Sequence, residues 1–440
     1  MSQVQQPPQA SPETISKMRS WLKKKLSMEL SLGAPASSIE TTTRQLLETA
    51  LAQSKFTLTS EARESLIEEV AATYGGFARI QPLLLDPEIT EIMVNAPDQV
   101  FVERGGKLEL SDVTFPDSRA IMGLIESIIL PLGRRVDANS PTVDARLPDG
   151  SRVNAVIPPA AIDGPILTIR KFSKEKLQFE DLIRLGSITS DIAEFMTACV
   201  ASRLNILVSG GTGSGKTTLL NILSGAIPEG ERIVTIEDAA ELDLQQVHRI
   251  RLETKPPDAD GAGEISIRHL VKNSLRMRPD RIIVGEVRGG EALDMLQAMN
   301  TGHDGSLTTV HANTPRDAVS RLETLVLLAG FDLPLKVVRA QIASALDLIV
   351  QQARLSDGSR KITSVTEVVG MEGETIVLNE IFKFDQRNRN GSENGAAPAI
   401  VPTGIRPMFE PRLKAAGFNF PPELFGADMV TTLNAGRKRR

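Results

Sequence analysis

The segment from residue 210 to residue 217 reads GGTGSGKT and matches the phosphate-binding pattern G-x-x-x-x-G-K-[ST]. The apolar stretch NILVS at 205–209 predicts a buried strand before it, and a helix is expected from Thr217 onward, which is the context that the pattern requires. Glycines let backbone N–H groups surround phosphates, the lysine bridges the β- and γ-phosphates, and the threonine hydroxyl binds Mg²⁺. The expected cofactors are therefore ATP and Mg²⁺. The predicted nucleotide-binding residues are Gly210, Gly211, Thr212, Gly213, Ser214, Gly215, Lys216, Thr217 and Thr218.

Carboxylates follow two further apolar segments of the chain. Glu286 follows RIIVG at 281–285, and at the carboxyl end of a predicted strand it is the candidate ligand for Mg²⁺ or for its water. The segment TIEDAAE at 235–241 holds Glu237, Asp238 and Glu241. Three carboxylates at one strand end repel each other unless a cation or a water-activating role separates them, so one of them is expected to be the general base. For any single acid, a solvated loop residue is the alternative.

Two of the four histidines, His303 and His311, lie on either side of the apolar stretch SLTTV. A zinc site would need further ligands close by, and the neighbouring sequence supplies none. We expect each histidine to act as a sensor of the γ-phosphate or as a sensor at the strand end. A satisfied structural histidine is the alternative for each.

Helical periodicity dominates the first 80 residues, after a Gln- and Pro-rich start that predicts a flexible arm over residues 1–10. A first helix is expected from Ser11 to about Gly33, and a second around 46–51. A third is expected to open at Ser60 and to stop at Gly75-Gly76. Together they predict a small three-helix bundle.

From about Asp86 the apolar spacing shifts toward two, which predicts a sheet domain. Helices are then expected at 179–185 and 190–203, before the phosphate loop. The predicted strands of the sheet domain are 92–94, 99–102, 107–110, 142–147, 152–157 and 166–172, with a helix at 119–129.

Composition excludes several classes of protein. The net charge of −5 argues against a general nucleic-acid binder, so no stable nucleic-acid partner is expected. A lone cysteine, Cys199, forms no internal disulfide, and the first residues lack the pattern of a secretory signal; both favour the cytoplasm. The most apolar run, at 121–132, is too short to span a bilayer and contains Glu126, so membrane contact is expected to be peripheral.

The order of these motifs resembles the type II/type IV secretion ATPase superfamily. The phosphate loop is followed by the acidic segment 235–241, by Gly285-Glu286 and by the segment 302–311 that contains both histidines. The RGGE sequence at 288–291 and the tail from Gly404 to Phe425 look most like the tight-adherence (Tad, Flp-type) pilus assembly ATPase. The absence of zinc-binding cysteines argues against a type II exporter.

This resemblance implies an α/β fold with a RecA-like P-loop ATPase domain, an N-terminal α/β (PAS-like) sheet domain and the three-helix bundle. It implies a homohexameric motor that drives pilus assembly through an inner-membrane platform protein. The implied domains are a flexible arm (1–10), the helix bundle (11–80), the N-terminal α/β domain (81–176), the ATPase domain (177–372) and a C-terminal extension (373–440) with a flexible loop at 387–398.

The resemblance also assigns roles to single residues. Glu241 is implied as the general base, Glu286 as the ligand of Mg²⁺ or its water, Glu237 as a nucleotide contact and His311 as a catalytic residue. Arg146, Arg152 and Arg170 match arginines that reach the phosphates in relatives, and their alternative is a solvated strand edge. Two other functions stay open: an ATPase of a conjugation or effector-secretion system, and a RecA-like nucleic-acid translocase.

Overall fold

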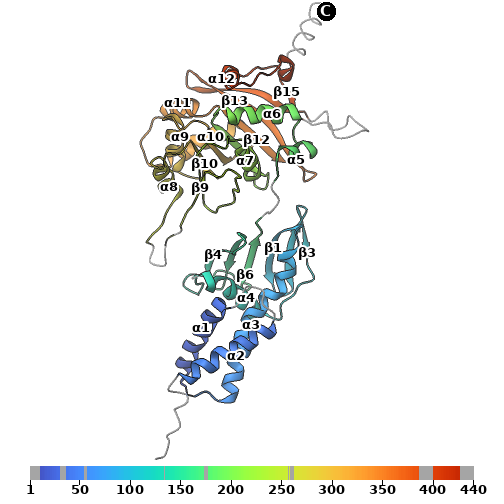
Figure 1. Cartoon of the computed structure of the whole chain (residues 1–440), viewed down its shortest axis with the longest axis vertical. Helices are drawn as coiled ribbons and strands as arrows, with labels where there is room; N and C mark the ends of the chain where they lie inside the picture. Colours follow the sequence, from blue (N-terminus) through green and yellow to red (C-terminus); the bar gives the residue numbers. More distant parts are fainter. Residues whose placement is uncertain are drawn as a thin grey trace, which may run out of the picture. The chain divides into compact units, whose positions relative to one another are not determined.

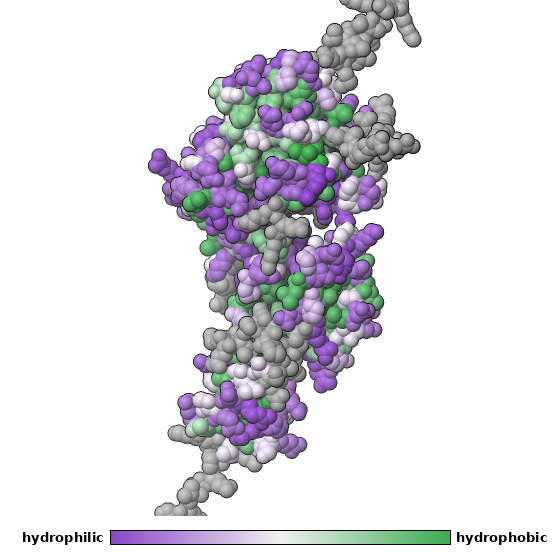
Figure 2. All heavy atoms as spheres, turned by 45° about the vertical axis from the view of Figure 1, so that its right-hand side comes forward, coloured by the Kyte–Doolittle hydropathy of each residue, from purple (hydrophilic) through white to green (hydrophobic). Residues whose placement is uncertain are grey.

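The computed structural model describes residues 10–29, 36–53, 57–132, 134–172, 177–255, 257, 262–385 and 400–426. The chain forms two compact units, Met1–Lys174 and Glu175–Arg440 (Figure 1). The expected arm up to residue 9, the expected loop at 387–398 and the basic residues 437–440 lie outside the described residues. Much of the face drawn in Figure 2 is hydrophilic, with smaller apolar patches on both units.

The first unit begins with three helices, α1 (Pro12–Glu29), α2 (Ala36–Ala52) and α3 (Ser60–Leu85). Thr59 caps α3, since its hydroxyl accepts the N–H of Ala62. The expected stop at Gly75-Gly76 is wrong, because α3 continues through both glycines to Leu85. Core contacts on either side offset the helix propensity that two glycines lose. Val70 is buried in the helix bundle and Ile80 in the sheet domain, so one helix joins the two cores.

Six antiparallel strands follow in the order β3-β2-β1-β6-β5-β4. One face of this sheet is apolar and packs against α3 and α4, as Ile92, Leu167 and Val153 illustrate. The side chains that alternate with them point to the opposite face. The elements are β1 (Ile89–Ala96), β2 (Gln99–Arg104), β3 (Lys107–Leu110), α4 (Ser118–Ile129), the 3₁₀ turn η1 (Leu130–Leu132), β4 (Thr142–Arg146), β5 (Arg152–Val156) and β6 (Ile166–Arg170).

The second unit holds a nine-stranded sheet in the order β15-β14-β13-β12-β7-β11-β10-β8-β9. The six strands from β12 to β9 are parallel, and β13, β14 and β15 extend the sheet in antiparallel fashion. The strands are β7 (Ile206–Gly210), β8 (Ile233–Glu237), β9 (Arg249–Glu253), β10 (Arg281–Val284), β11 (Leu307–His311), β12 (Leu348–Arg354), β13 (Arg360–Glu372), β14 (Thr375–Phe384) and β15 (Ile400–Pro402).

Helices cover both faces of this sheet, as in a doubly wound fold (Figure 1). On one face lie α5 (Phe179–Arg184), α6 (Ser190–Ala201) and α7 (Lys216–Gly225). On the other lie α8 (Ile267–Ser274), α9 (Glu291–Asn300), α10 (Pro315–Leu327) and α11 (Leu335–Ala345). The parallel strands inside the sheet are buried on both faces, which is why they read as apolar runs, whereas the edge strand β9 (RIRLE) is partly exposed and alternates. The fold class expected from the sequence is confirmed.

The chain after residue 372 continues the same body. The expected boundary at 372/373 falls in the turn between β13 and β14, inside one sheet. Phe195 of α6 packs its ring against Phe382, Phe409 and Phe425, which come from β14 and from the segment with α12 (Glu410–Ala415) and the 3₁₀ turn η3 (Pro422–Phe425). These aromatic contacts hold residues 400–426 against the core of the second unit. Among the described residues, no helix is long and apolar enough to cross a bilayer.

Candidate functional site

The predicted chemistry gathers at the carboxyl edge of the parallel strands. Strand register places His311, the last residue of β11, beside Gly210, the last residue of β7. On the other side of β7, Gln352 of β12 lies at the same level. Glu286 follows β10, and Glu237 ends β8, the next strand along the sheet. Ligands bind at this edge in open α/β sheets because the loops after the strands converge there.

The phosphate loop has the backbone that its glycines allow. Gly213 and Gly215 have φ values of +68° and +95°, a region that side chains disfavour. A Cβ atom on Gly210 would lie 2.4 Å from the Gln352 carbonyl oxygen, so the close approach of β12 also requires a glycine there. Lys216 begins α7 directly after Gly215, and Thr217 is its second residue. The loop thus ends at a helix N-terminus, where backbone N–H groups and the helix dipole favour an anion.

A chain of polar contacts links the phosphate loop to Glu286. Nζ of Lys216 lies 3.3 Å from both ring nitrogens of His311, and it donates to the Gly211 carbonyl oxygen at 3.1 Å. His311 Nε2 lies 2.8 Å from Glu286 Oε1, and Arg288 donates to Glu286 Oε2 at 2.7 Å. Partial burial, foremost, and the charges of Lys216 and Arg288 lower the pKa of His311, against the raising effect of Glu286. The lowered pKa favours the neutral imidazole, which lies between the lysine and the glutamate.

The donor set at this edge fits Mg²⁺ only together with a nucleotide. In the part of the chain that the structure describes, no three His, Cys, Asp or Glu side chains are grouped as a protein-only metal site would need. Mg²⁺ commonly takes one or two protein oxygens, several waters and phosphate oxygens. The Thr217 hydroxyl and the Glu286 carboxylate, whose side chain is 18% exposed, supply oxygens of the required kind.

The two glutamates of the acidic segment after β8, Glu237 and Glu241, differ in burial. Glu237 is buried, and its Oε1 accepts the N–H groups of Glu241 and Leu242 at 2.9 and 3.0 Å. Burial raises the pKa of Glu237 to about 7, although both hydrogen bonds lower it. The Glu237 carboxylate thus holds the loop that carries the half-buried Glu241. The hydrogen bonds of Oε1 go to the loop backbone, and the nucleotide contact expected of Glu237 from the sequence stays a prediction.

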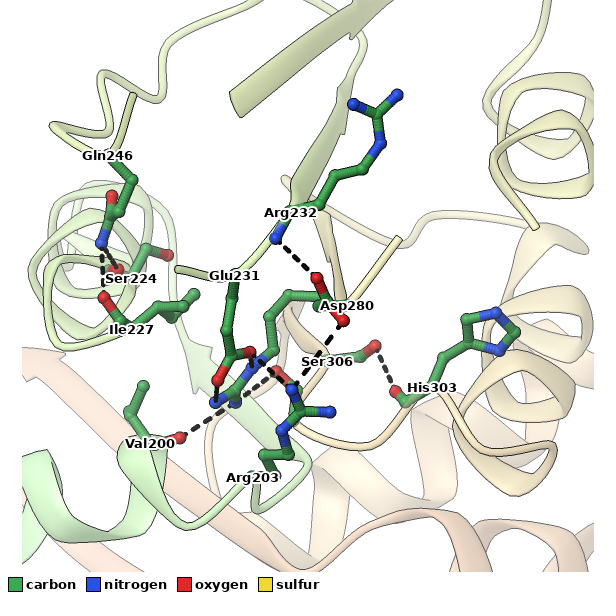
Figure 3. A network of polar contacts seen from close by, with 12 residues as sticks. Val200, Arg203, Ser224, Ile227, Glu231, Arg232, Gln246, Asp280, His303 and Ser306 are labelled. Atoms are coloured by element: carbon green, nitrogen blue, oxygen red, sulfur yellow. Dashed lines mark hydrogen bonds and ion pairs between the residues drawn. The ribbon is translucent and has the colours of Figure 1, made fainter. Parts of the chain in front are cut away.

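His303 lies at the opposite edge of the sheet. It precedes β11 by four residues, and Leu307 at the start of β11 pairs with Ile206 at the start of β7. Its Nδ1 lies 3.3 Å from the Ala298 carbonyl oxygen, and its own carbonyl accepts the hydroxyl of Ser306 at 2.8 Å (Figure 3). Within this chain, the expected nucleotide contact of His303 is therefore at odds with the structure, because β11 separates His303 from the phosphate loop.

The three predicted arginines form one lateral row in the first unit. Arg146 pairs with Arg152 across β4 and β5, and Arg152 pairs with Arg170 across β5 and β6. Directly opposed residues project from the same face, so this row lies on the face turned away from α3 and α4. Arg170 pairs in turn with Glu91 of β1, with 3.6 Å between Nε and Oε1. Like charges directly opposite one another are unfavourable. An anion beside the row would offset this repulsion, and guanidinium groups suit phosphate oxygens.

Sequence reasoning missed the cations beside the phosphate loop within the second unit. Arg354 and Arg360 pair across β12 and β13, and Nε of Arg360 donates to the Gly213 carbonyl oxygen at 3.0 Å. A Cβ atom on Gly213 would lie 3.8 Å from an Arg354 guanidinium nitrogen. No local motif marks these residues; the apolar run 348–350, followed by basic residues around Asp357-Gly358, was the available signal.

The sequence matches the protein family described as "Type II/IV secretion system protein" over residues 75–386. The chain belongs to this family. A putative conjugal transfer protein of Mycobacterium tuberculosis is 39% identical over 304 residues, covering 68% of this chain and 86% of that protein. The type IV secretion system protein VirB11 of Bartonella quintana is 32% identical over 337 residues, covering 68% and 93%. The solved VirB11 ATPase of Brucella suis, crystallised with sulphate, has a TM-score of 0.37 at 31% identity and covers 69% and 96%.

Membership in this family confirms the resemblance expected from the sequence and implies use of a nucleotide. The matched range, 75–386, includes the arginine row, the phosphate loop, the acidic segment and the strand that ends at His311. The residues brought together at the carboxyl edge therefore lie inside the range that the family model matches.

Proposed function

We propose that this protein hydrolyses Mg²⁺-bound ATP as one subunit of a homohexameric motor. The observation that carries the proposal is the contact chain from Lys216 through His311 to Glu286, at the end of a phosphate loop. A cation, an imidazole and a carboxylate in contact beside the phosphate loop support the proposal, because these groups can bind and position a γ-phosphate. Catalysis of phosphoryl transfer rests on such positioning and on electrostatic stabilisation.

Each residue has a distinct task in this proposal. Lys216 and the loop N–H groups bind the phosphates, and Thr217 and Glu286 hold Mg²⁺, which neutralises the phosphate charge when bound. Glu241 orients the attacking water and accepts its proton. His311 connects Lys216 to Glu286 and responds to the γ-phosphate. The arginine row supplies further cations to the transferred group, because planar guanidinium groups suit phosphate oxygens.

The cellular process that we propose is assembly, with disassembly as a further capacity, of a tight-adherence type IV pilus. The motor would act from the cytoplasmic side on an inner-membrane platform protein and contact the membrane only peripherally. The RGGE sequence supports this branch by its resemblance to the tight-adherence ATPase. Glu291 Oε1 accepts the N–H groups of Arg288 and Gly289, the residues that lead into α9, at 2.7 and 2.8 Å. The segment therefore fixes the backbone directly after Glu286.

A second candidate is the ATPase of a conjugation or effector-secretion system. The names of the similar proteins, conjugal transfer protein and VirB11, favour this candidate. Pilin and platform genes beside the gene for this chain would support pilus assembly, and conjugation genes would support the alternative. A nucleic-acid translocase is disfavoured by the net charge of −5, and DNA affinity with a steep salt dependence would be its mark.

The decisive experiment compares the wild type with Lys216→Ala. Phosphate release by the wild type should require both ATP and Mg²⁺, and the variant should be nearly inactive because it lacks the cation at the transferred group. Lys216 is buried to 7% exposure, so thermal unfolding of both proteins must be shown to match first. Wild-type turnover in a folded Lys216→Ala protein would refute the proposed role of the phosphate loop.

A further inference from the structure

The first residue of β13 contacts the phosphate loop. Nε of Arg360 donates to the Gly213 carbonyl oxygen at 3.0 Å. A Cβ atom added to Gly215 would lie 3.2 Å from Cδ of Arg360, so the arginine stem also lies against the loop. Two glycines of the loop thus lie against one arginine that comes from 147 residues later in the chain.

Arg360 and the next residue of β13, Lys361, both bond to the turn that follows α5. The Arg360 carbonyl oxygen accepts the hydroxyl of Ser187 at 2.8 Å. Nζ of Lys361 donates to the carbonyl oxygens of Leu185 and Gly186 at 2.6 and 3.0 Å. Partial burial lowers the pKa of Lys361. The carbonyls of the C-cap residue Leu185 and of Gly186 after it therefore accept from a cation on the strand that contacts the phosphate loop, a favourable arrangement at a helix C-terminus.

α5 lies at the start of the second unit, so these contacts bear on how that unit begins. The two units meet in sequence at 174/175, and α5 is the first helix after that point. Its N-cap residue Gln178 also lies close to α7: a Cβ atom on Gly225 would be 3.8 Å from Gln178 Oε1. Both ends of α5 are thus held by elements that adjoin the phosphate loop.

We propose that Arg360 and Lys361 couple the phosphate loop to α5. Arg360 is a positioning residue that fixes the loop through the Gly213 carbonyl, and Lys361 fixes the turn 185–187 from the same strand. When an anion binds the loop N–H groups, the loop peptides become more polarised and the Arg360 bond strengthens, because hydrogen bonds in a chain reinforce each other. Nucleotide binding then orders the start of the second unit. This inference rests on the proposed nucleotide function.

Coupling is reciprocal, so weakening the turn must weaken nucleotide binding by the same factor. In the full-length chain, Arg360→Ala should raise the Kd for the Mg²⁺ complex of a non-hydrolysable ATP analogue about ten-fold, the scale of one lost charge-assisted hydrogen bond. Lys361→Met, which keeps the apolar stem, should raise it about two- to three-fold, within the usual range of coupling energies. With Arg360→Ala already present, Lys361→Met should have no further effect, since its path to the loop is cut.

Amide hydrogen exchange reads the other direction of the same coupling. The amides of Leu185, Gly186 and Ser187 donate to carbonyl oxygens of α5, so their protection reports how well the turn is ordered on the helix. The analogue should increase their protection in the wild type and leave it unchanged in Arg360→Ala and in Lys361→Met. Arg360→Lys, which keeps the charge, should retain part of the response.

The control variant is Arg339→Ala, because Arg339 bonds Glu323 and the Glu374 carbonyl in the same unit. It should change neither the Kd nor the protection at 185–187. Wild-type affinity and wild-type protection in Arg360→Ala would overturn the inference, as would independent effects of the two substitutions on the Kd. A wild type that fails to bind the analogue would instead refute the proposed function, so the two failures are distinguishable.

Discussion

The two edges of the nine-stranded sheet both carry charged side chains, but they pair these charges differently. At the amino edge, Arg281 is fully buried and its guanidinium makes four contacts: two with Glu231, at 2.5 and 3.2 Å, and two with the carbonyl oxygens of Val200 and Gly305, at 2.9 and 3.2 Å (Figure 3). At the carboxyl edge, Arg288 is 58% exposed and contacts Glu286 and Asp238. Arg281 is therefore held in place by buried partners, whereas Arg288 is accessible to solvent.

This difference separates structural from functional charge. A buried ion pair tolerates neither loss of a partner nor displacement, because a charge left alone in the interior is very costly. A Cβ atom on Gly305 would lie 1.9 Å from an Arg281 nitrogen, so even the backbone is fitted to this guanidinium. In the proposed function, groups at the carboxyl edge exchange their partners for a ligand, which a fully satisfied, fully buried network could not do.

The largest expected effect contrasts Arg281→Ala with Arg288→Ala. Arg281→Ala leaves Glu231 without its main partner and should lower the free energy of unfolding by about 3–5 kcal/mol. Arg288→Ala removes an exposed ion pair and should change it by less than about 1 kcal/mol, while ATP turnover falls. Denaturant unfolding of the second unit measures both variants. Equal losses of stability would contradict the division between the two edges.

Within the carboxyl edge, the next comparison separates Glu241 from Glu286. Glu241→Gln should lower turnover about 10²- to 10⁴-fold while Mg²⁺-bound ATP remains bound, as expected for a lost general base. Glu286→Gln should instead weaken the Mg²⁺ dependence of binding or disturb the placement of water. Titrations of ATP and Mg²⁺ with both variants measure the difference. Rescue of Glu241→Gln, but not of Glu286→Gln, by excess Mg²⁺ would show that the roles are reversed.

A smaller effect concerns pH and the buried Glu237. The unfolded carboxyl loses its proton near pH 4.5 and the folded one near pH 7, so between these values the folded chain binds more protons. Its contribution to the free energy of unfolding therefore falls as pH rises from about 4.5 to about 7, by about 3 kcal/mol at most. Glu237→Gln keeps an acceptor for the Glu241 N–H and removes this dependence.

Thermal unfolding at pH 5 and pH 8 tests this point. Relative to the wild type, Glu237→Gln should be similar in stability at pH 5 and more stable at pH 8. It should also bind ATP normally, because the carboxylate serves the loop backbone. A constant difference between the two proteins at both pH values would contradict the titration of this residue.

Sequence reasoning succeeded where local pattern decides the structure. The phosphate loop and the strands before Gly210 and Glu286 follow from glycine spacing and from apolar runs, which are local properties. It failed where tertiary contacts override the local signal: Gly75-Gly76 lies inside α3 because the helix packs into one core before the glycines, at Val70, and into another after them, at Ile80. The contact between Arg360 and Gly213 joins residues 147 positions apart, and neither segment contains a local pattern that predicts it.

The last comparison sets the arginine row of the first unit against the phosphate loop of the second. Arg146→Ala, Arg152→Ala or Arg170→Ala should each lower turnover ten-fold or more, the scale of a lost cation at the transferred group. Arg119→Ala is the matched control, since Arg119 is 93% exposed and pairs only locally with Asp117. It should leave turnover unchanged.

The isolated second unit, residues 175–440, sharpens this comparison because it contains the complete phosphate loop but lacks the row. It should bind ATP with wild-type affinity and hydrolyse it poorly, since the row is needed by the transferred group and not by the bound nucleotide. Binding titrations and phosphate release on the same preparation measure both properties. Rapid hydrolysis by this fragment would show that the second unit holds a complete site, and the proposed contribution of Arg146, Arg152 and Arg170 would then be wrong.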